Sequence, residues 1–292
     1  MTSGQRDFLA YINGRVVPYS EAAPILQRIN ARSAGGYYDT ARTFGGKTFR
    51  LRQHIERLFN GLTYSNIDTG LSIEDMETIS IGLVGTNHSL IEGENHEMTV
   101  TQTVTVSRPE AADDLPGVDV AIYCSLLDVS AFARSYVEGV RIYTPNTYPE
   151  PQGQSAGDGK TGAVQVLPLM SNARGHITEC RGANFMFVSD GRIKLPDRSN
   201  VLPGVSMHTV LEIADYLGIG VDEGLYNQRE LYDADEAFVS STRYCLLPVA
   251  SINGYPLGDS VPGSLTESLL SRWKEIVGVD FVERALDSLS GE

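Results

Sequence analysis

The sequence predicts an α+β protein of two domains with mostly antiparallel sheets. In the first part of the chain, strand-like segments joined by Gly-containing turns are followed by stretches with helical spacing of apolar residues. The second part is rich in strand-like segments and has few helices. The 292 residues suffice for two domains of roughly 150 residues each. We place these domains at 1–125 and 136–292, with a linker at 126–135.

The first part contains two predicted hairpins and two predicted helices. Asn13-Gly14 lies between apolar residues, which is a strong signal for a hairpin turn, and Gly45-Gly46 marks a second one. Apolar spacing predicts a helix over 51–62. Ser72 as N-cap with Asp75 three residues later predicts the start of another helix. Two long strands are expected next, over 98–107 and 118–127.

The second part begins with an unusual loop. Residues 144–162 include three prolines and four glycines among 19 positions, and a loop of this length in a compact domain is functional or disordered. Strands, a turn at Asn172–Gly175 and a hairpin turn at Asp190-Gly191 are expected after it. Apolar periodicity predicts helices in VSMHTVLEIADYLGI and SLTESLLSRWKEIVG.

Composition excludes several classes of function. The 23 Lys and Arg residues against 37 Asp and Glu residues give a net charge of −14, which argues against nucleic acid or an anionic membrane as a partner. We find no apolar run of membrane-spanning length and no secretory signal, so we expect a cytoplasmic protein. The three cysteines are far apart, as in proteins of a reducing compartment, and the five histidines lack metal-ligand spacing. Lysine occurs only four times, at Lys47, Lys160, Lys194 and Lys274.

Five segments in matching order resemble the class IV aminotransferases. These are enzymes of fold type IV that use pyridoxal 5′-phosphate (PLP), and they include branched-chain and D-amino-acid aminotransferases and aminodeoxychorismate lyase. The segments are YINGRVVP, RTFGGKTFRLRQHIERL, HITECRGANFMFVSDGRI, NVLPGVSMHTVLEIADYLGI and EAFVSSTRYCLLPVASINGYPLGD. The resemblance implies a small N-terminal α/β sandwich, a larger barrel-like C-terminal domain, a homodimer, and transfer of an amino group between an amino acid or amine and a 2-keto acid.

The resemblance assigns phosphate contacts to three segments. Arg57 in HIERL matches the arginine that holds the PLP phosphate, and a guanidinium fork suits that anion. Val205 and Ser206 match backbone contacts at a helix N-terminus, and Ser241 and Thr242 match hydroxyls on the phosphate side. Taken alone, Arg57 is better explained as a solvated charge paired with Glu56 or Asp68, and Ser206 could equally be a simple N-cap.

The remaining assigned positions concern the ring, the reacting amine and the substrate. Glu179 matches the glutamate that faces the pyridine nitrogen and keeps it protonated, and Asn184 is expected to order the same hairpin. Lys160 matches the lysine that forms a Schiff base with PLP and carries the α-proton. Tyr38 and Arg108 match positions that line the substrate pocket or bind its carboxylate. The local alternatives are an exposed hairpin glutamate, a loop lysine, a strand aromatic and a strand-end arginine.

One region departs from the family pattern. Lys160 and Glu179 are only 19 residues apart, and the helix that follows the lysine in the family is missing. TGAVQV after Lys160 also lacks the tyrosine that bonds the PLP ring oxygen. Two interpretations follow: a working transaminase with an atypical lysine loop, or a derived member that has become a cofactor-independent enzyme or a phosphate-ligand binding protein. The retained Arg57, Glu179 and Ser206 favour the transaminase.

Overall fold

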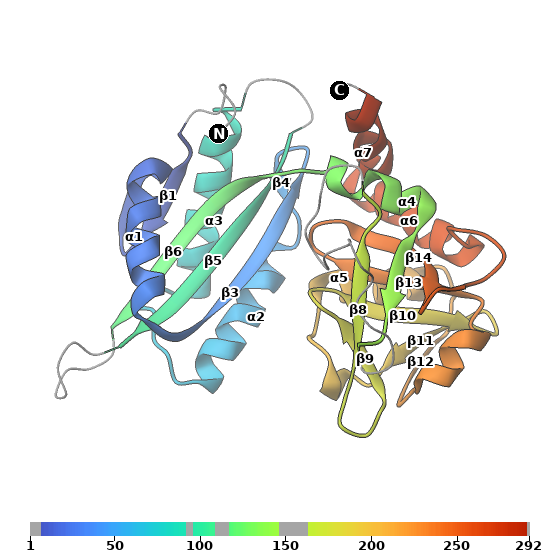
Figure 1. Cartoon of the computed structure of the whole chain (residues 1–292). Helices are drawn as coiled ribbons and strands as arrows, with labels where there is room; N and C mark the ends of the chain where they lie inside the picture. Colours follow the sequence, from blue (N-terminus) through green and yellow to red (C-terminus); the bar gives the residue numbers. More distant parts are fainter. Residues whose placement is uncertain (1–6, 92–95, 109–116, 146–162, 291–292) are drawn as a thin grey trace. The chain divides into compact units, whose positions relative to one another are not determined.

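The computed structural model describes residues 7–91, 96–108, 117–145 and 163–290. The chain divides into two compact units, Met1–Leu127 (unit 1) and Asp128–Glu292 (unit 2), and both combine helices with a sheet (Figure 1). The α+β class is therefore confirmed. The linker predicted at 126–135 stays a prediction; this range contains the 3₁₀ helix η1 (Ser130–Phe132) and the start of α4 (Ala133–Glu138).

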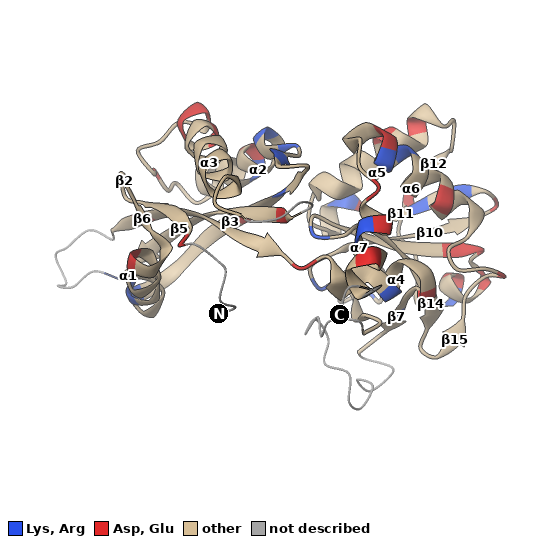
Figure 2. Cartoon of the chain, turned by 90° about the horizontal axis from the view of Figure 1, so that it is seen from above, with Lys and Arg blue, Asp and Glu red and all other residues tan. Residues whose placement is uncertain are grey.

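In its described residues, unit 1 is a six-stranded antiparallel sheet with three helices. The strand order is β2-β1-β6-β5-β3-β4. The strands are β1 (Leu9–Ile12), β2 (Arg15–Pro18), β3 (Ser33–Phe44), β4 (Lys47–Thr48), β5 (Glu97–Ser107) and β6 (Val118–Leu127). The helices are α1 (Tyr19–Arg32), α2 (Leu51–Tyr64) and α3 (Ile73–His88). Helix α1 covers one face of the sheet and helices α2 and α3 cover the other (Figure 2).

Strand alternation explains how one sheet serves two cores. In β6, Ile122 packs toward α2 and α3, whereas the neighbouring Ala121 packs toward α1, because successive side chains of a strand point to opposite faces. Small residues dominate under α1, where Ala10 and Ala22 are fully buried. The larger cluster under α2 and α3 contains Ile55 with other aliphatic side chains and forms the main core of the unit.

The described part of unit 2 is a curled nine-stranded sheet with helices around it. Its strands follow the order β12-β11-β10-β13-β14-β7-β8-β9, and β15 pairs with β14. The strands are β7 (Val140–Tyr143), β8 (Val166–Ser171), β9 (Ile177–Cys180), β10 (Asn184–Ser189), β11 (Arg192–Pro196), β12 (Val221–Gly224), β13 (Glu236–Ser241), β14 (Cys245–Ile252) and β15 (Tyr255–Pro256). The other helices are α5 (Val205–Tyr216), α6 (Ser264–Val277), α7 (Phe281–Ser290), η2 (Arg198–Asn200) and η3 (Gln228–Asp233). A bridge between Cys180 and Ala183 links the two ends of the β9–β10 turn.

Most of the predicted local structure is confirmed. Asn13 and Gly14 adopt φ of 49° and 86°, and Asp190 and Gly191 adopt 55° and 67°, as tight hairpin turns require. Ser72 Oγ accepts a hydrogen bond from Asp75 N, and Asp75 Oδ2 accepts one from Ser72 N, so the capping box at the start of α3 is complete. Residues 144 and 145 are described, but residues 146–162 of the predicted loop lie outside the described residues.

Among the described residues, three α-helices were not predicted from the sequence: α1, α4 and α7. Helix α1 has the apolar spacing of a helix in Ala22, Ile25 and Ile29, but Pro24 lies within it and obscures the pattern. Helix α7 follows α6 after a short turn at Gly278, which adopts φ 68° and ends α6 in a left-handed conformation.

Candidate cofactor site

The side chain of Glu179 is fixed against the segment that precedes helix α5. Glu179 Oε2 accepts hydrogen bonds from Leu202 N at 2.9 Å and from Asn184 Nδ2 at 3.3 Å. Asn184 Nδ2 also donates to Leu202 O at 2.9 Å. As expected, Asn184 orders this hairpin, and it does so by tying β9, β10 and the Leu202 segment together. A half-buried carboxylate is thus held in one position near the start of a helix.

Helix α5 begins at a glycine that has no room for a side chain. A Cβ at Gly204 would lie 2.0 Å from Asn184 Oδ1, so only glycine permits this approach. Gly204 provides no side-chain cap, and Val205 and Ser206 are nearly buried in the first turn that follows. The N–H groups of a first helical turn have no partner within the helix and favour an anion. This end of α5 therefore has the properties of a phosphate cradle.

The turn between β13 and β14 adds hydroxyl groups. Ser240 pairs with Asn184 across β13 and β10, so their side chains share one face of the sheet. Ser240 is 1% exposed, and within the described part of the chain its Oγ has no hydrogen-bond partner. Ser241 and Thr242 follow at the end of β13, half-buried. Sequence reasoning missed Ser240, although the period of two along β13 could have singled it out.

Ser241 also forms a hydrogen bond with the buried hydroxyl of Tyr244. Burial raises the pKa of the Tyr244 hydroxyl, the nearby Cys180 thiol raises it further, and a hydrogen bond with Ser241 opposes this shift only in part. Tyr136 Oη donates to Tyr244 O at 2.8 Å. Tyr244 thus stays protonated at neutral pH and fixes the orientation of the turn that presents Ser241.

Arg57 lies in unit 1 and is bound by a buried carboxylate. Arg57 Nε donates to Asp39 Oδ2 at 2.7 Å and its Nη2 donates to Oδ1 at 2.8 Å. His54 Nδ1 lies 2.8 Å from Asp39 Oδ1. Burial works to raise the pKa of Asp39, but the hydrogen bonds with His54 and Arg57 outweigh it, so this pKa lies below its ordinary value.

The two acids named as the local alternative for Arg57 have other partners. Glu56 pairs with Arg52 at 3.1 Å, and Asp68 accepts a hydrogen bond from Gly70 N. Asp39 takes their place because β3 passes beneath α2 and brings a distant carboxylate under the helix. The sequence separation of 18 residues gave no local signal for this pair.

The expected substrate positions both lie in unit 1. Tyr38 in β3 is 74% exposed and lies next to Asp39 in the chain. Arg108 follows β5, is exposed, and donates its backbone N–H to Arg32 O at 3.0 Å. Their expected roles in substrate binding remain predictions.

Lys160 lies outside the described residues, and the other three lysines are engaged or exposed. Lys194 Nζ donates to Asp222 at 2.7 Å, and Lys274 Nζ donates to Asp280 at 2.8 Å. These two lysines are therefore ion-paired rather than simply solvated. The hydrogen bond with Asp222 raises the pKa of Lys194, which opposes the neutral amine that a nucleophile needs. Lys47 is exposed in β4.

No metal centre or membrane helix was found in the described part of the molecule. Residues 7–91, 96–108, 117–145 and 163–290 contain no group of three or more His, Cys, Asp or Glu side chains that could hold a metal ion. None of the helices in these ranges has the length and apolar character needed to cross a membrane. The three cysteines, Cys124, Cys180 and Cys245, are buried free thiols.

Comparisons with known proteins give one consistent answer. Residues 159–252 match the family model for amino-transferase class IV. The D-alanine aminotransferase of Listeria innocua is 24% identical over 269 residues, covering 88% of this chain and 92% of that protein. The D-alanine aminotransferase of Bacillus licheniformis is 24% identical over 276 residues, covering 88% of this chain and 93% of that protein.

Solved structures share the fold. The branched-chain amino acid aminotransferase from Thermobaculum terrenum in its PLP form superposes with a TM-score of 0.76 at 22% identity, covering 97% of both chains. The branched-chain enzyme from Escherichia coli gives 0.72 at 19% identity, covering 94% of this chain and 95% of that one. Residues 159–252 thus match the class IV aminotransferase family, and over nearly its whole length the chain has the fold of these branched-chain enzymes.

Proposed function

We propose that this aminotransferase acts on small apolar amino acids and their 2-oxo acids, with Lys160 as its reactive amine. The names of the relatives, which are D-alanine and branched-chain amino acid aminotransferases, support this substrate class. The single observation that carries the site is the convergence of three segments of unit 2 on Asn184: the Glu179 strand, the start of α5 and the end of β13.

The residues of unit 2 fit PLP. Gly204 leaves a space that a Cβ would fill, the first turn of α5 offers N–H groups to a phosphate, and the buried Ser240 Oγ has no partner among the described residues. We assign the phosphate to Val205, Ser206, Ser241 and Thr242, add Ser240, and include Arg57 on the basis of the family resemblance. Bound PLP supplies an electron sink for the amino-group transfer.

The chain's own groups have separate tasks. Glu179, held by Leu202 N–H and the Asn184 amide, presents a carboxylate to the pyridine nitrogen and keeps a proton there. Lys160 binds the cofactor and then accepts and returns the α-proton of the substrate. Elimination supports this choice, because Lys194 and Lys274 are ion-paired and Lys47 is exposed. Arg108 binds the substrate carboxylate, and Tyr38 lines the same pocket.

The organisation of the protein in the cell belongs to the same proposal. The acidic composition and the three free thiols support a cytoplasmic location. The family resemblance supports a homodimer and the two domains at 1–125 and 136–292.

The test is PLP addition, removal of free cofactor, borohydride reduction and peptide mass mapping. We expect a yellow protein before reduction and a pyridoxyl group on the Lys160 peptide after it. The Lys160→Ala variant should transaminate neither D- nor L-amino acids. Lys194→Ala serves as the matched control and should be labelled and active as the wild type. An unlabelled, colourless wild type would refute the transaminase and favour a different ligand for the same cradle.

A further inference from the structure

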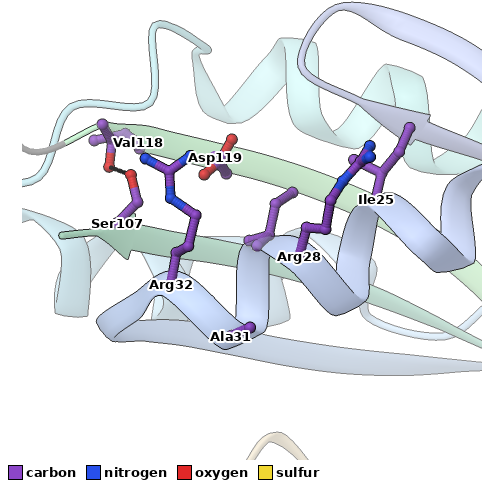
Figure 3. A pocket seen from close by; sticks show the side chains of 9 residues that line it. Ile25, Arg28, Ala31, Arg32, Ser107, Val118 and Asp119 are labelled. Carbon is purple, nitrogen blue, oxygen red and sulfur yellow. Dashed lines mark hydrogen bonds between the residues drawn. The ribbon is translucent and has the colours of Figure 1, made fainter. Parts of the chain in front are cut away.

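A cavity lies within unit 1, between the C-terminal half of α1 and the paired ends of β5 and β6 (Figure 3). Its volume is about 440 Å³, within the range of small-molecule sites. Its polar lining residues are Arg28, Arg32, Ser107 and Asp119, and its apolar ones include Ile25 and Ile29. All of them belong to one compact unit, so the cavity does not depend on unit 2.

Two guanidinium groups line one side of this cavity. Arg28 and Arg32 are four residues apart on α1, so they project from neighbouring turns of the same helix face. Both are exposed, and Arg28 makes no hydrogen bond or ion pair with any described residue. Like charges at this spacing repel each other, and an anion bound beside Arg28 would offset that repulsion. A guanidinium fork is suited to a carboxylate.

The opposite side of the cavity limits the charge of the ligand. The carboxylate of Asp119 points toward Arg32, and its Oδ1 accepts a hydrogen bond from Asn13 Nδ2 at 2.8 Å, which fixes it in place. Two arginines and one aspartate give the lining a net charge of +1, from +2 − 1. This balance favours a monoanion, because a dianion would be repelled by Asp119.

The helix also supplies an apolar wall. Ile25 and Ile29 follow each other by one turn on α1 and are half-buried beside the arginines, and Val118 of β6 lines the cavity across from them. We propose that this cavity binds a small monocarboxylate with a short apolar body, its carboxylate between Arg28 and Arg32 and its body against Ile25 and Ile29. A 2-oxo acid and an apolar amino acid share this chemistry.

Isothermal titration of the full chain with 4-methylpentanoate tests the proposal. We expect one-to-one binding that weakens at least tenfold in Arg28→Ala and is unchanged in Arg15→Ala, a matched exposed arginine of unit 1 outside the cavity. Inorganic sulfate should bind more weakly because it lacks the apolar body. Equal affinity of wild type and Arg28→Ala, or no binding at all, would overturn the proposal.

Two further arms separate this cavity from the cofactor site and identify the source of the carboxylate. Glu179→Ala should still bind 4-methylpentanoate. If Glu179→Ala loses this binding and Arg28→Ala keeps it, the probe binds at the cofactor site and the proposal is refuted. If 4-methyl-2-oxopentanoate binds more tightly than 4-methylpentanoate, the result supports a 2-oxo acid. If leucine binds more tightly than 4-methylpentanoate and Asp119→Asn abolishes this difference, the result supports an amino acid. None of these readouts requires PLP or transamination, so they stand apart from the test of the proposed function.

Discussion

Gly204 shows how a single residue type can decide whether the proposed cofactor cradle forms. Its missing side chain lets the Asn184 amide approach the start of α5, and that amide in turn holds Glu179. Any Cβ at this position must displace Asn184 or the helix. The site therefore depends on a backbone approach as much as on its charged groups.

We expect Gly204→Ala to lower the free energy of unfolding by about 1–3 kcal/mol through overpacking, and to weaken PLP binding. Urea denaturation and PLP titration measure the two effects. Gly82→Ala is the control, since Gly82 lies in helix α3 with nothing within 4 Å of the added Cβ. It should raise stability by about 0.5–1 kcal/mol. A Gly204→Ala protein with wild-type stability and PLP affinity would contradict the cradle.

Asp39 gives a prediction about pH. We expect Asp39→Asn to cost roughly 3 kcal/mol at neutral pH, because it leaves the positive charge of Arg57 without its buried partner. The pKa of Asp39 is lower in the folded than in the unfolded chain. Its contribution is therefore complete above the unfolded pKa of about 3.9 and is lost as the pH falls through the folded pKa.

Denaturation midpoints of the two proteins between neutral pH and pH 3 measure this difference. The wild type should lose its advantage over Asp39→Asn only below about pH 4. Asp222→Asn, which breaks an exposed ion pair with Arg192 and Lys194, is the control and should change stability much less. An advantage of the wild type that persists undiminished at pH 3 would show that Asp39 does not act through its charge.

At the scale of the element, helix α3 illustrates a start signal that needs no tertiary context. Ser72 and Asp75 satisfy each other's backbone N–H groups, and both residues are readable directly from the sequence. We expect Ser72→Ala to lower the free energy of unfolding by about 1 kcal/mol. Thr78→Ala on the exposed side of the same helix should be neutral or slightly stabilising, since alanine has the higher helix propensity. Equal effects of the two substitutions in urea denaturation would argue against the cap.

Other elements show where local prediction fails. The turns at Asn13-Gly14 and Asp190-Gly191 were predicted because those residues adopt positive φ readily. Helix α1 was not predicted, because Pro24 interrupts its apolar pattern, although the helix accommodates this proline. Because α1 was not predicted, the cavity in unit 1 was not predicted either, since α1 supplies both of its arginines.

At the scale of the whole molecule, PLP should act as a stabilising ligand. A ligand that binds only the folded chain at 100 times its Kd adds about 2.7 kcal/mol to the free energy of unfolding. We expect thermal unfolding of the wild type to shift upward with PLP concentration, and the shift to be reduced in Glu179→Ala. A wild type whose unfolding temperature ignores PLP would contradict the cofactor assignment of these residues.

The proposed homodimer predicts the mass in solution. Light scattering coupled to size exclusion should give twice the 31.8 kDa of one chain. A mass of one chain across the micromolar range would refute the dimer and leave the fold and the cofactor cradle unaffected.

The sequence by itself determined the α+β class, most hairpins, the capped helix α3 and the resemblance to the class IV aminotransferases, because these depend on local chemistry and on motifs in a fixed order. It also predicted cofactor contacts at Glu179, Val205 and Ser206, and these assignments stay predictions. Only the tertiary structure decided that Asn184 joins Glu179 to the start of α5, that Ser240 shares their face, and that Asp39 rather than Glu56 binds Arg57. These pairings join segments distant in sequence, and strand register and helix packing bring them together without any local signal.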